Sequence, residues 1–301
     1  MAILFDNFRS WGQYCADRNL PLYAPVLEYE TEQKGRGETE IWDGLQRAWT
    51  VMREAVQTGL TENMTSRSGM INNGAQKVAK AKPILSPEFQ KLVSRALAAK
   101  EVNSCMGRIV AAPTAGASGI LPGILVTLQE QHELTDRTIL EGLLVAAGIG
   151  LIIEQNASLA GAVGGCQAET GSAAAMGAGA IVHCLGGDVS EAFAAVAITI
   201  QCMLGLVCDP VAGLVEVPCV VRNASAAAIA YSSAQIAVAG VNPVIPVDEC
   251  VQALGEVGQS METRYKETAM GGLAATLTGQ RIAKQVLIQD IDVLPDEEEV
   301  H

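Results

Sequence analysis

The sequence predicts an all-α protein, a single helical domain with a buried central apolar helix and glycine-rich loops. Helical periodicity is clear over residues 41–58 and 136–153, whereas two-residue alternation is scarce and strands do not alternate with helices. Hydrophobic residues make up 49% of the 301 residues, enough for a sizeable core. We predict an N-terminal extension (1–40), a helical domain (41–285) and an acidic tail (286–301).

Start and stop signals delimit the predicted helices. Gly59 is the expected stop of the helix over 41–58. Residues 86–88 combine a serine cap with a first-position proline and an early acid. Asp188 and Glu191 have the spacing of a capping box, and residues 246–249 open the last clear helix.

The central helix is predicted from the longest apolar run, residues 192–208, which Thr199 and Gln201 interrupt. Asp209 follows the run, whereas a membrane-spanning helix needs about 20 apolar residues and usually basic flanks. The net charge of −13 argues against nucleic acid or an anionic membrane as a partner. Residues 1–10 lack a signal-peptide pattern, so we expect a cytoplasmic protein.

Residues 138–221 contain no lysine or arginine, although they contain seven acidic residues. Glycine, alanine, serine and cysteine dominate this stretch, and such small residues let helices and loops approach closely. A segment without basic side chains is poorly suited to the protein surface. We therefore expect it at the centre of the protein, where acidic groups need partners or a role.

Eight cysteines in a cytosolic chain are rarely paired as disulfides. Cys166, Cys208 and Cys219 each lie beside glycine or proline, where the chain turns and a thiolate can face inward. No C-x-x-C pair occurs, so zinc fingers and ferredoxin-type clusters fit poorly. Spacing alone leaves both three buried free thiols and a metal site open. The other five are expected to be packed thiols: Cys15, Cys105, Cys184, Cys202 and Cys250.

Several long motifs resemble the alpha chain of iron–sulfur-dependent L-serine dehydratases. They are NASLAGAVGGCQAE at 156–169, LVCDPVAGLVEVPCVVRNA at 206–224, AAPTAG at 111–116, ETAMGGLAAT at 267–276 and SRSG at 66–69. The likeness covers roughly residues 40–283, in the order and spacing of that family. Several long motifs in one order are far more specific than any short pattern.

The resemblance implies a lyase of amino-acid degradation and gluconeogenesis that converts L-serine to pyruvate and ammonia. It implies a [4Fe-4S] cluster held by Cys166, Cys208 and Cys219, whose open iron acts as a Lewis acid on the serine hydroxyl. It also implies a separate beta subunit, because the sequence contains nothing like the beta portion.

A carboxylate substrate needs a cation or backbone amides. Arg222 offers the cation, and the turn over 114–119 offers the amides. The turn over 114–119 has amides and hydroxyls for an anion nest, with a plain tight turn as the alternative. For Asn156 and Glu169 the alternative is helix-end capping, and for Arg222 it is a structural salt bridge. The candidate substrate-binding residues are Thr114, Ala115, Gly116, Ser118, Asn156, Glu169 and Arg222.

The general base is not identified by the sequence. None of His132, His183 and His301 has a convincing context, and Lys77 is a weak candidate, so the base is expected from this lysine or from the partner chain. Lys266 stands where the family often has arginine, which leaves the preference among serine, threonine and cysteine open.

Two other functions remain as alternatives. A pyridoxal-phosphate lyase would hold its phosphate at residues 114–119, but no lysine has a convincing Schiff-base context. A non-catalytic iron–sulfur redox sensor would keep the three thiolates without the polar pocket around them.

Overall fold

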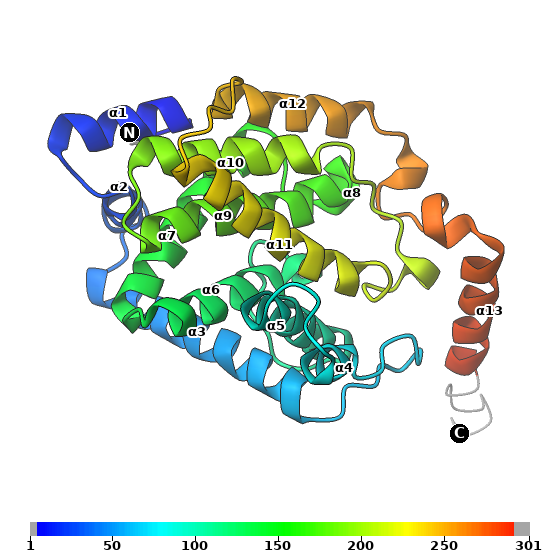
Figure 1. Ribbon diagram of the computed structural model, residues 1–301. Coiled ribbons are helices and arrows are strands. Elements are labelled where there is room, and N and C mark those ends of the chain that lie inside the picture. The colour runs from blue at the N-terminus through cyan, green and yellow to red at the C-terminus, as the bar shows by residue number, and fades with distance from the viewer. Residues whose placement is uncertain (1–4, 292–301) are drawn as a thin grey trace, which may run out of the picture.

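The computed structural model describes residues 5–291, with side chains described up to residue 288. Helices are the only regular secondary structure in this range. Within this range the protein has thirteen α-helices and no strand, apart from isolated bridges from Thr65 to Asn72 and from Cys208 to Lys266 (Figure 1). The predicted all-α class is therefore confirmed.

The α-helices are, in order, α1 (Phe8–Arg18), α2 (Tyr23–Glu28), α3 (Glu38–Thr61), α4 (Gly74–Lys80), α5 (Pro87–Ser104), α6 (Ile120–His132), α7 (Asp136–Asn156), α8 (Gly161–Gly164), α9 (Ser172–Cys184), α10 (Val189–Met203), α11 (Cys219–Val238), α12 (Val247–Ser260) and α13 (Leu277–Ile291). Between them lie the π-helical turns η1 (Tyr29–Gln33) and η3 (Gln167–Gly171), and the 3-10 turns η2 (Ala115–Ala117), η4 (Val211–Gly213), η5 (Thr263–Tyr265) and η6 (Gly272–Ala275).

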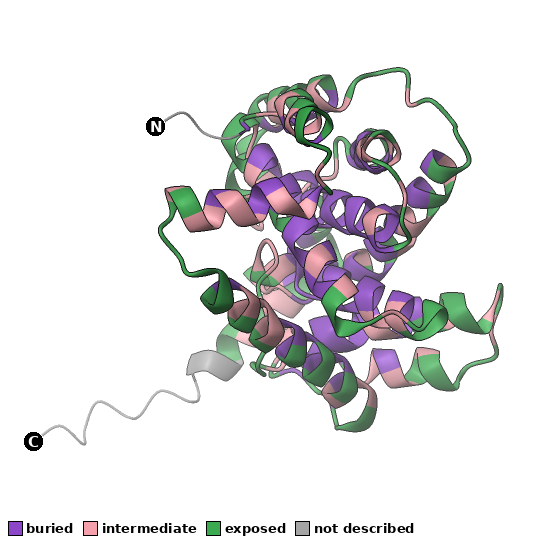
Figure 2. Cartoon of the chain, turned by 90° about the vertical axis from the view of Figure 1, so that its left-hand side faces the viewer, coloured by how far each residue is buried: buried purple, intermediate pink, exposed green. Residues whose placement is uncertain are grey.

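The helix at the centre of the protein is α9. All its residues except His183 are buried, and it packs against α6, α7, α10 and α11 (Figure 2 shows the buried residues gathered in the middle of the molecule). Small residues make this possible. A Cβ added at Gly177 would lie 2.4 Å from Ile124 Cδ1, and one at Gly179 would lie 2.3 Å from Ile149 Cδ1.

The prediction that the run 192–208 forms the central helix is wrong in its position. That run begins inside α10, which ends at Met203 and exposes Cys202, so this thiol is not packed as expected. Gly205 follows with a φ of +83°, a conformation that favours glycine and directs the chain away from the helix axis. Cys208 therefore lies in an irregular segment between α10 and α11.

The N-terminal residues join the same core. Phe5 stacks on Trp11 with ring centroids 5.0 Å apart, and Trp11 donates from Nε1 to the Leu22 carbonyl at 3.1 Å. All three side chains are buried within the main hydrophobic cluster. The segment predicted as an extension thus packs onto the helical domain. The acidic run at residues 296–299 of the predicted tail lies outside the described residues.

Helix α7 is long and apolar enough to cross a membrane, the only one among the described residues. Within its most apolar 18-residue window, however, 67% of the residues are buried inside the protein. It packs against α2 and α9, which is the environment of a core helix.

The predicted starts at Ser86 and Asp188 are confirmed, whereas α3 begins at Glu38 and continues to Thr61, past its predicted stop at Gly59. Ser86 Oγ accepts the Phe89 amide at 3.1 Å, and Pro87 occupies the first turn of α5. Asp188 and Glu191 each accept the other's backbone amide at 2.8 Å, which is the capping box expected for α10.

Two glycines of α3 give opposite predictions for stability. A Cβ at Gly59 would lie 2.3 Å from the Ala98 carbonyl oxygen of α5, so Gly59→Ala should lower the free energy of unfolding by about 1–3 kcal/mol. Gly44 meets only the flexible end of Arg47 at 3.8 Å, so Gly44→Ala should raise it by up to about 1 kcal/mol. Urea unfolding followed by circular dichroism measures both, and equal effects would contradict the close approach of α3 and α5.

Candidate functional site

Three buried cysteines from separate segments lie near one end of α9, close enough for their charges to interact. Cys166 directly precedes η3, Cys208 lies between α10 and α11, and Cys219 is the first residue of α11. Burial raises the pKa of all three thiols, that of Cys219 to about 12, and Cys166 raises the pKa of both Cys208 and Cys219. The sequence-predicted metal ligands are therefore brought together.

Backbone hydrogen bonds fix these segments to one another. The Gln167 amide donates to the Leu206 carbonyl at 2.9 Å, which joins η3 to the irregular segment. The Cys208 amide donates to the Tyr265 carbonyl at 2.8 Å, and the Cys208 carbonyl accepts from the Glu267 amide at 2.9 Å. The segment around Cys208 is thus held between the start of α9 and the loop that follows α12.

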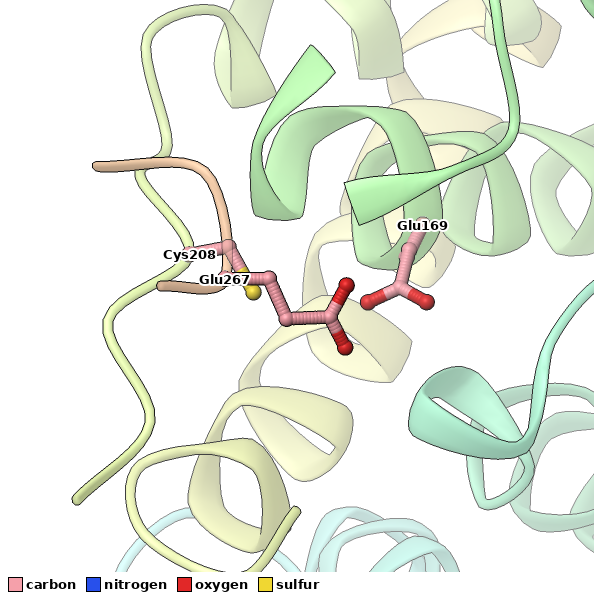
Figure 3. Close-up of side chains that lie close together, drawn as sticks. All are labelled: Glu169, Cys208 and Glu267. Carbon is pink, nitrogen blue, oxygen red and sulfur yellow. The ribbon is translucent and has the colours of Figure 1, made fainter. Parts of the chain in front are cut away.

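Two carboxylates point toward each other beside Cys208. Ligand atoms of Glu169, Cys208 and Glu267 lie within 4.8 Å of one another, and Figure 3 shows the two carboxyl groups facing. Burial raises the pKa of Glu169, and the negative charge of Glu267 raises it further. Like charges this close favour a bound cation or a shared proton.

The backbone of two glycines packs closely against the carboxylate of Glu169. A Cβ added at Gly116 would lie 3.0 Å from Glu169 Oε2, and one at Gly161 would lie 2.9 Å from the same oxygen. Only glycine leaves room for the carboxylate at this separation. Gly116 and Glu169, both predicted as substrate-binding residues, are therefore direct neighbours.

The predicted substrate residue Arg222 forms a salt bridge with Asp209. Its Nη2 lies 2.9 Å from Asp209 Oδ1, and its Nη1 donates to the Val207 carbonyl at 2.8 Å. Asp209 Oδ2 also accepts the Leu273 amide at 2.7 Å. The guanidinium thus ties the Cys208 segment to α11, and its positive charge lowers the pKa of Cys166. Substrate binding by Arg222 stays a prediction.

The turn that contains Thr114, Ala115, Gly116 and Ser118 is clamped by Asn223 of α11. Asn223 Nδ2 donates to the Gly116 carbonyl at 2.8 Å, and its Oδ1 accepts the Gly119 amide at 2.9 Å. The Ser118 hydroxyl is buried and has no hydrogen-bond partner among the described residues. A buried polar atom left unpaired in this way is available to a ligand.

Lys100 is the site residue that sequence reasoning missed. It lies on α5 with no exposed surface, and its Nζ donates to the Ala115 carbonyl at 3.3 Å. Burial lowers its pKa to about 8. The sequence did contain a signal for this residue. Lys100 follows Leu92 by eight residues and Ala96 by four, so it lies on the apolar face of α5, where a lysine is unusual.

The SRSG motif is linked to this centre through Glu216. Ser66 Oγ donates to Glu216 Oε2 at 2.7 Å, and Ser68 Oγ donates to the same oxygen at 2.5 Å. Glu216 is buried and its charge acts on Lys100. The loop before α4 is thereby anchored to the wall of the site.

Other sequence candidates lie elsewhere. Asn156 is exposed and donates to the Asp6 and Ile152 carbonyls, both at 2.9 Å, as a helix-end residue does. Lys77 is exposed and its Nζ donates to the Asn72 carbonyl at 2.7 Å. Its predicted role as the base has no support in this geometry.

None of the described histidines is placed at the thiols. His183 packs edge-on against Tyr23 with ring centroids 5.9 Å apart, and His132 ends α6 with its side chain exposed. His301 lies outside the described residues.

Fold and site together define an all-α protein with a buried centre of thiols, carboxylates and one lysine. The family model described as "Serine dehydratase alpha chain" matches residues 17–274. The chain therefore belongs to the serine dehydratase alpha chain family.

Named relatives agree with this membership. The chain is 44% identical over 288 residues to "L-serine dehydratase, alpha chain" of Peptoniphilus asaccharolyticus, which covers 94% of this chain and 99% of that protein. It is 40% identical to "Probable L-serine dehydratase, alpha chain" of Bacillus subtilis, over 94% of this chain and 95% of the relative. With "L-serine dehydratase" of Streptomyces coelicolor the identity is 37%, over 86% of this chain but only 59% of the relative.

Thiol reactivity should separate the site cysteines from the exposed one. In metal-free protein at pH 8, iodoacetamide should modify Cys202 first, because the thiolate is the reactive form and this side chain is exposed. Cys166, Cys208 and Cys219 should stay unmodified until the protein unfolds, since burial keeps their pKa raised. Peptide mass spectrometry reads out each site, and early labelling of the three would contradict their burial.

Proposed function

We propose that this chain is the alpha chain of an enzyme that dehydrates and deaminates L-serine to pyruvate and ammonia in the cytoplasm. The observation that carries the proposal is the convergence of three buried thiols with Glu169, Lys100 and the turn over 114–119. Relatives named L-serine dehydratase, alpha chain, support the same reaction.

The donor set fits a [4Fe-4S] cluster held by Cys166, Cys208 and Cys219. Thiolates are the ligands of iron–sulfur clusters, and three of them leave one iron open. Each thiol binds a different iron of such a cluster, so the sulfurs need not converge on one point as ligands of a single ion would. Bound there, the cluster would supply a Lewis acid for the substrate hydroxyl.

The residues of this chain would orient the substrate. The spare hydroxyl of Ser118 and the amides of the 114–119 turn suit the serine carboxylate. Glu169 stands beside this turn and next to Cys208, where it can accept a hydrogen bond from the substrate ammonium. Asn223 and Arg222 act indirectly, because they fix the turn and the Cys208 segment by direct hydrogen bonds and an ion pair.

A partner chain is part of the proposal. The match spans only 59% of the Streptomyces coelicolor relative, so that protein contains a portion that this chain does not match. Exposed apolar side chains surround the site: Val163 near Gly161, Val221 beside Arg222, Met270 after Glu267, and Leu273 at Asp209. We assign this rim to a beta chain, because exposed apolar groups around a reaction centre favour covering.

Lys100 also gives the pyridoxal-phosphate alternative the buried lysine that the sequence did not reveal. That function would leave three buried thiols without a role, whereas the cluster uses all three. Iron and acid-labile sulfide analysis of protein purified without oxygen distinguishes the two. Borohydride reduction, which traps a lysine Schiff base, gives an independent answer.

Replacement of the thiols tests the function directly. Cys166→Ser, Cys208→Ser and Cys219→Ser should each lose bound iron and serine-dependent pyruvate formation, because a hard hydroxyl is a poor iron ligand. Cys202→Ser is the matched control on the exposed face of α10 and should retain both. The assay uses anaerobically reconstituted protein with the beta chain present. Full activity of the three variants would refute the cluster, and loss in all four would show a general folding defect.

A further inference from the structure

We propose that Lys100 is the catalytic base that removes the Cα proton of the amino-acid substrate. The inference rests on the proposed dehydration and assigns the group that the sequence left unidentified. Lys100 touches the turn over 114–119 through the Ala115 carbonyl, and that turn is where the substrate carboxylate is placed. Since Cα is bonded directly to the carboxylate carbon, a base beside this turn lies close to the proton.

The hydrogen-bonding state of Lys100 leaves it free to react. The bond to Ala115 is its only hydrogen bond among the described residues, and no carboxylate there lies within ion-pair distance. The other basic residues of α5 differ, because Lys91 and Arg95 both pair with Glu130. A buried lysine without an anionic partner costs stability, which indicates a role other than holding the fold.

The groups around Lys100 come from three elements. Cys219 begins α11, Cys166 and Glu169 lie at η3, and Glu216 lies in the turn before α11. The carboxylates of Glu169 and Glu216, and the two cysteines when ionised, favour the ammonium form, but burial outweighs them and lowers the pKa of Lys100 to about 8. The neutral amine, which is the basic form, is therefore populated as the pH rises through about 8.

Alternative bases are less well placed. His132 and His183 lie away from the thiols, and Lys77 is exposed at the Asn72 carbonyl. Glu169 faces Glu267 and Cys208, so it shares its surroundings with a second carboxyl group and a thiol. Lys100 is the amine in the described part of the chain that is both buried and directed at the proposed carboxylate site.

The proposed step balances without a further reactant. The neutral Nζ takes the Cα proton and becomes an ammonium, while the Cα–H electron pair forms the Cα–Cβ double bond. The Cβ–O bond breaks, and the departing hydroxide takes up the proton held by Lys100 and leaves as water. The product, 2-aminoacrylate, tautomerises to an imine, and one water hydrolyses it to pyruvate and ammonia.

The test compares Lys100→Met and Lys100→Arg with Lys91→Met, an exposed control on the same helix, in the reconstituted holoenzyme with its beta chain. Both Lys100 variants should keep the wild-type iron content and the serine-dependent change of the visible spectrum. Their kcat should fall by about 10²- to 10⁴-fold. Exchange of deuterium from Cα-deuterated serine into water should fall equally, and ethylamine should partly restore kcat in Lys100→Ala.

Each outcome decides the assignment. An unchanged kcat in Lys100→Met overturns it, and so does a raised KM with unchanged kcat, which would make Lys100 a carboxylate-binding residue. If the variants lose iron, the wild-type pH profile decides, because kcat should rise with pH as Lys100, whose pKa burial lowers, loses its proton. A flat profile would overturn the base assignment. Wild-type protein without iron or serine turnover would instead refute the proposed function itself.

Discussion

The desolvation of negative charge at one end of α9 is the constraint on which this structure depends. Three thiols and the carboxylates of Glu169 and Glu216 are gathered where water is largely excluded, and burial raises the pKa of each thiol. The nearby cations are Lys100 and Arg222. In metal-free protein such a site avoids the cost by keeping its thiols protonated, whereas a bound iron–sulfur cluster would stabilise them as thiolates.

Close approach of backbones lets so many polar groups share one small volume. Small residues bring α9 against its neighbours, and the glycines at 116 and 161 let the backbone reach Glu169. The segment around Cys208 has no regular structure of its own, so its amide and carbonyl are paired with the loop after α12. Side chains do the remaining positioning: Asn223 clamps the turn over 114–119, and Arg222 holds Asp209.

The sequence predicted the helical class and the helix caps because these depend on local signals, as at Ser86 and Asp188. It placed the central helix one element too late, because α9 and α10 are both apolar and periodicity does not tell which neighbour is enclosed. Glu267 was noticed only as part of a motif. Its position beside Cys208 depends on a loop with a φ of +63° and on pairing across distant segments, which no local pattern encodes.

The two cations of the site divide its tasks according to their chemistry. Arginine presents a planar fork that suits a fixed structural contact, and both bonded nitrogens of Arg222 hold the Cys208 segment. Lysine loses its proton far more readily when buried, and burial lowers the pKa of Lys100, so this residue can change charge within the accessible pH range. Exchange of the two residues would give the loop a titrating anchor and the substrate a permanent cation. The proton transfer proposed for Lys100 requires the arrangement that the structure has.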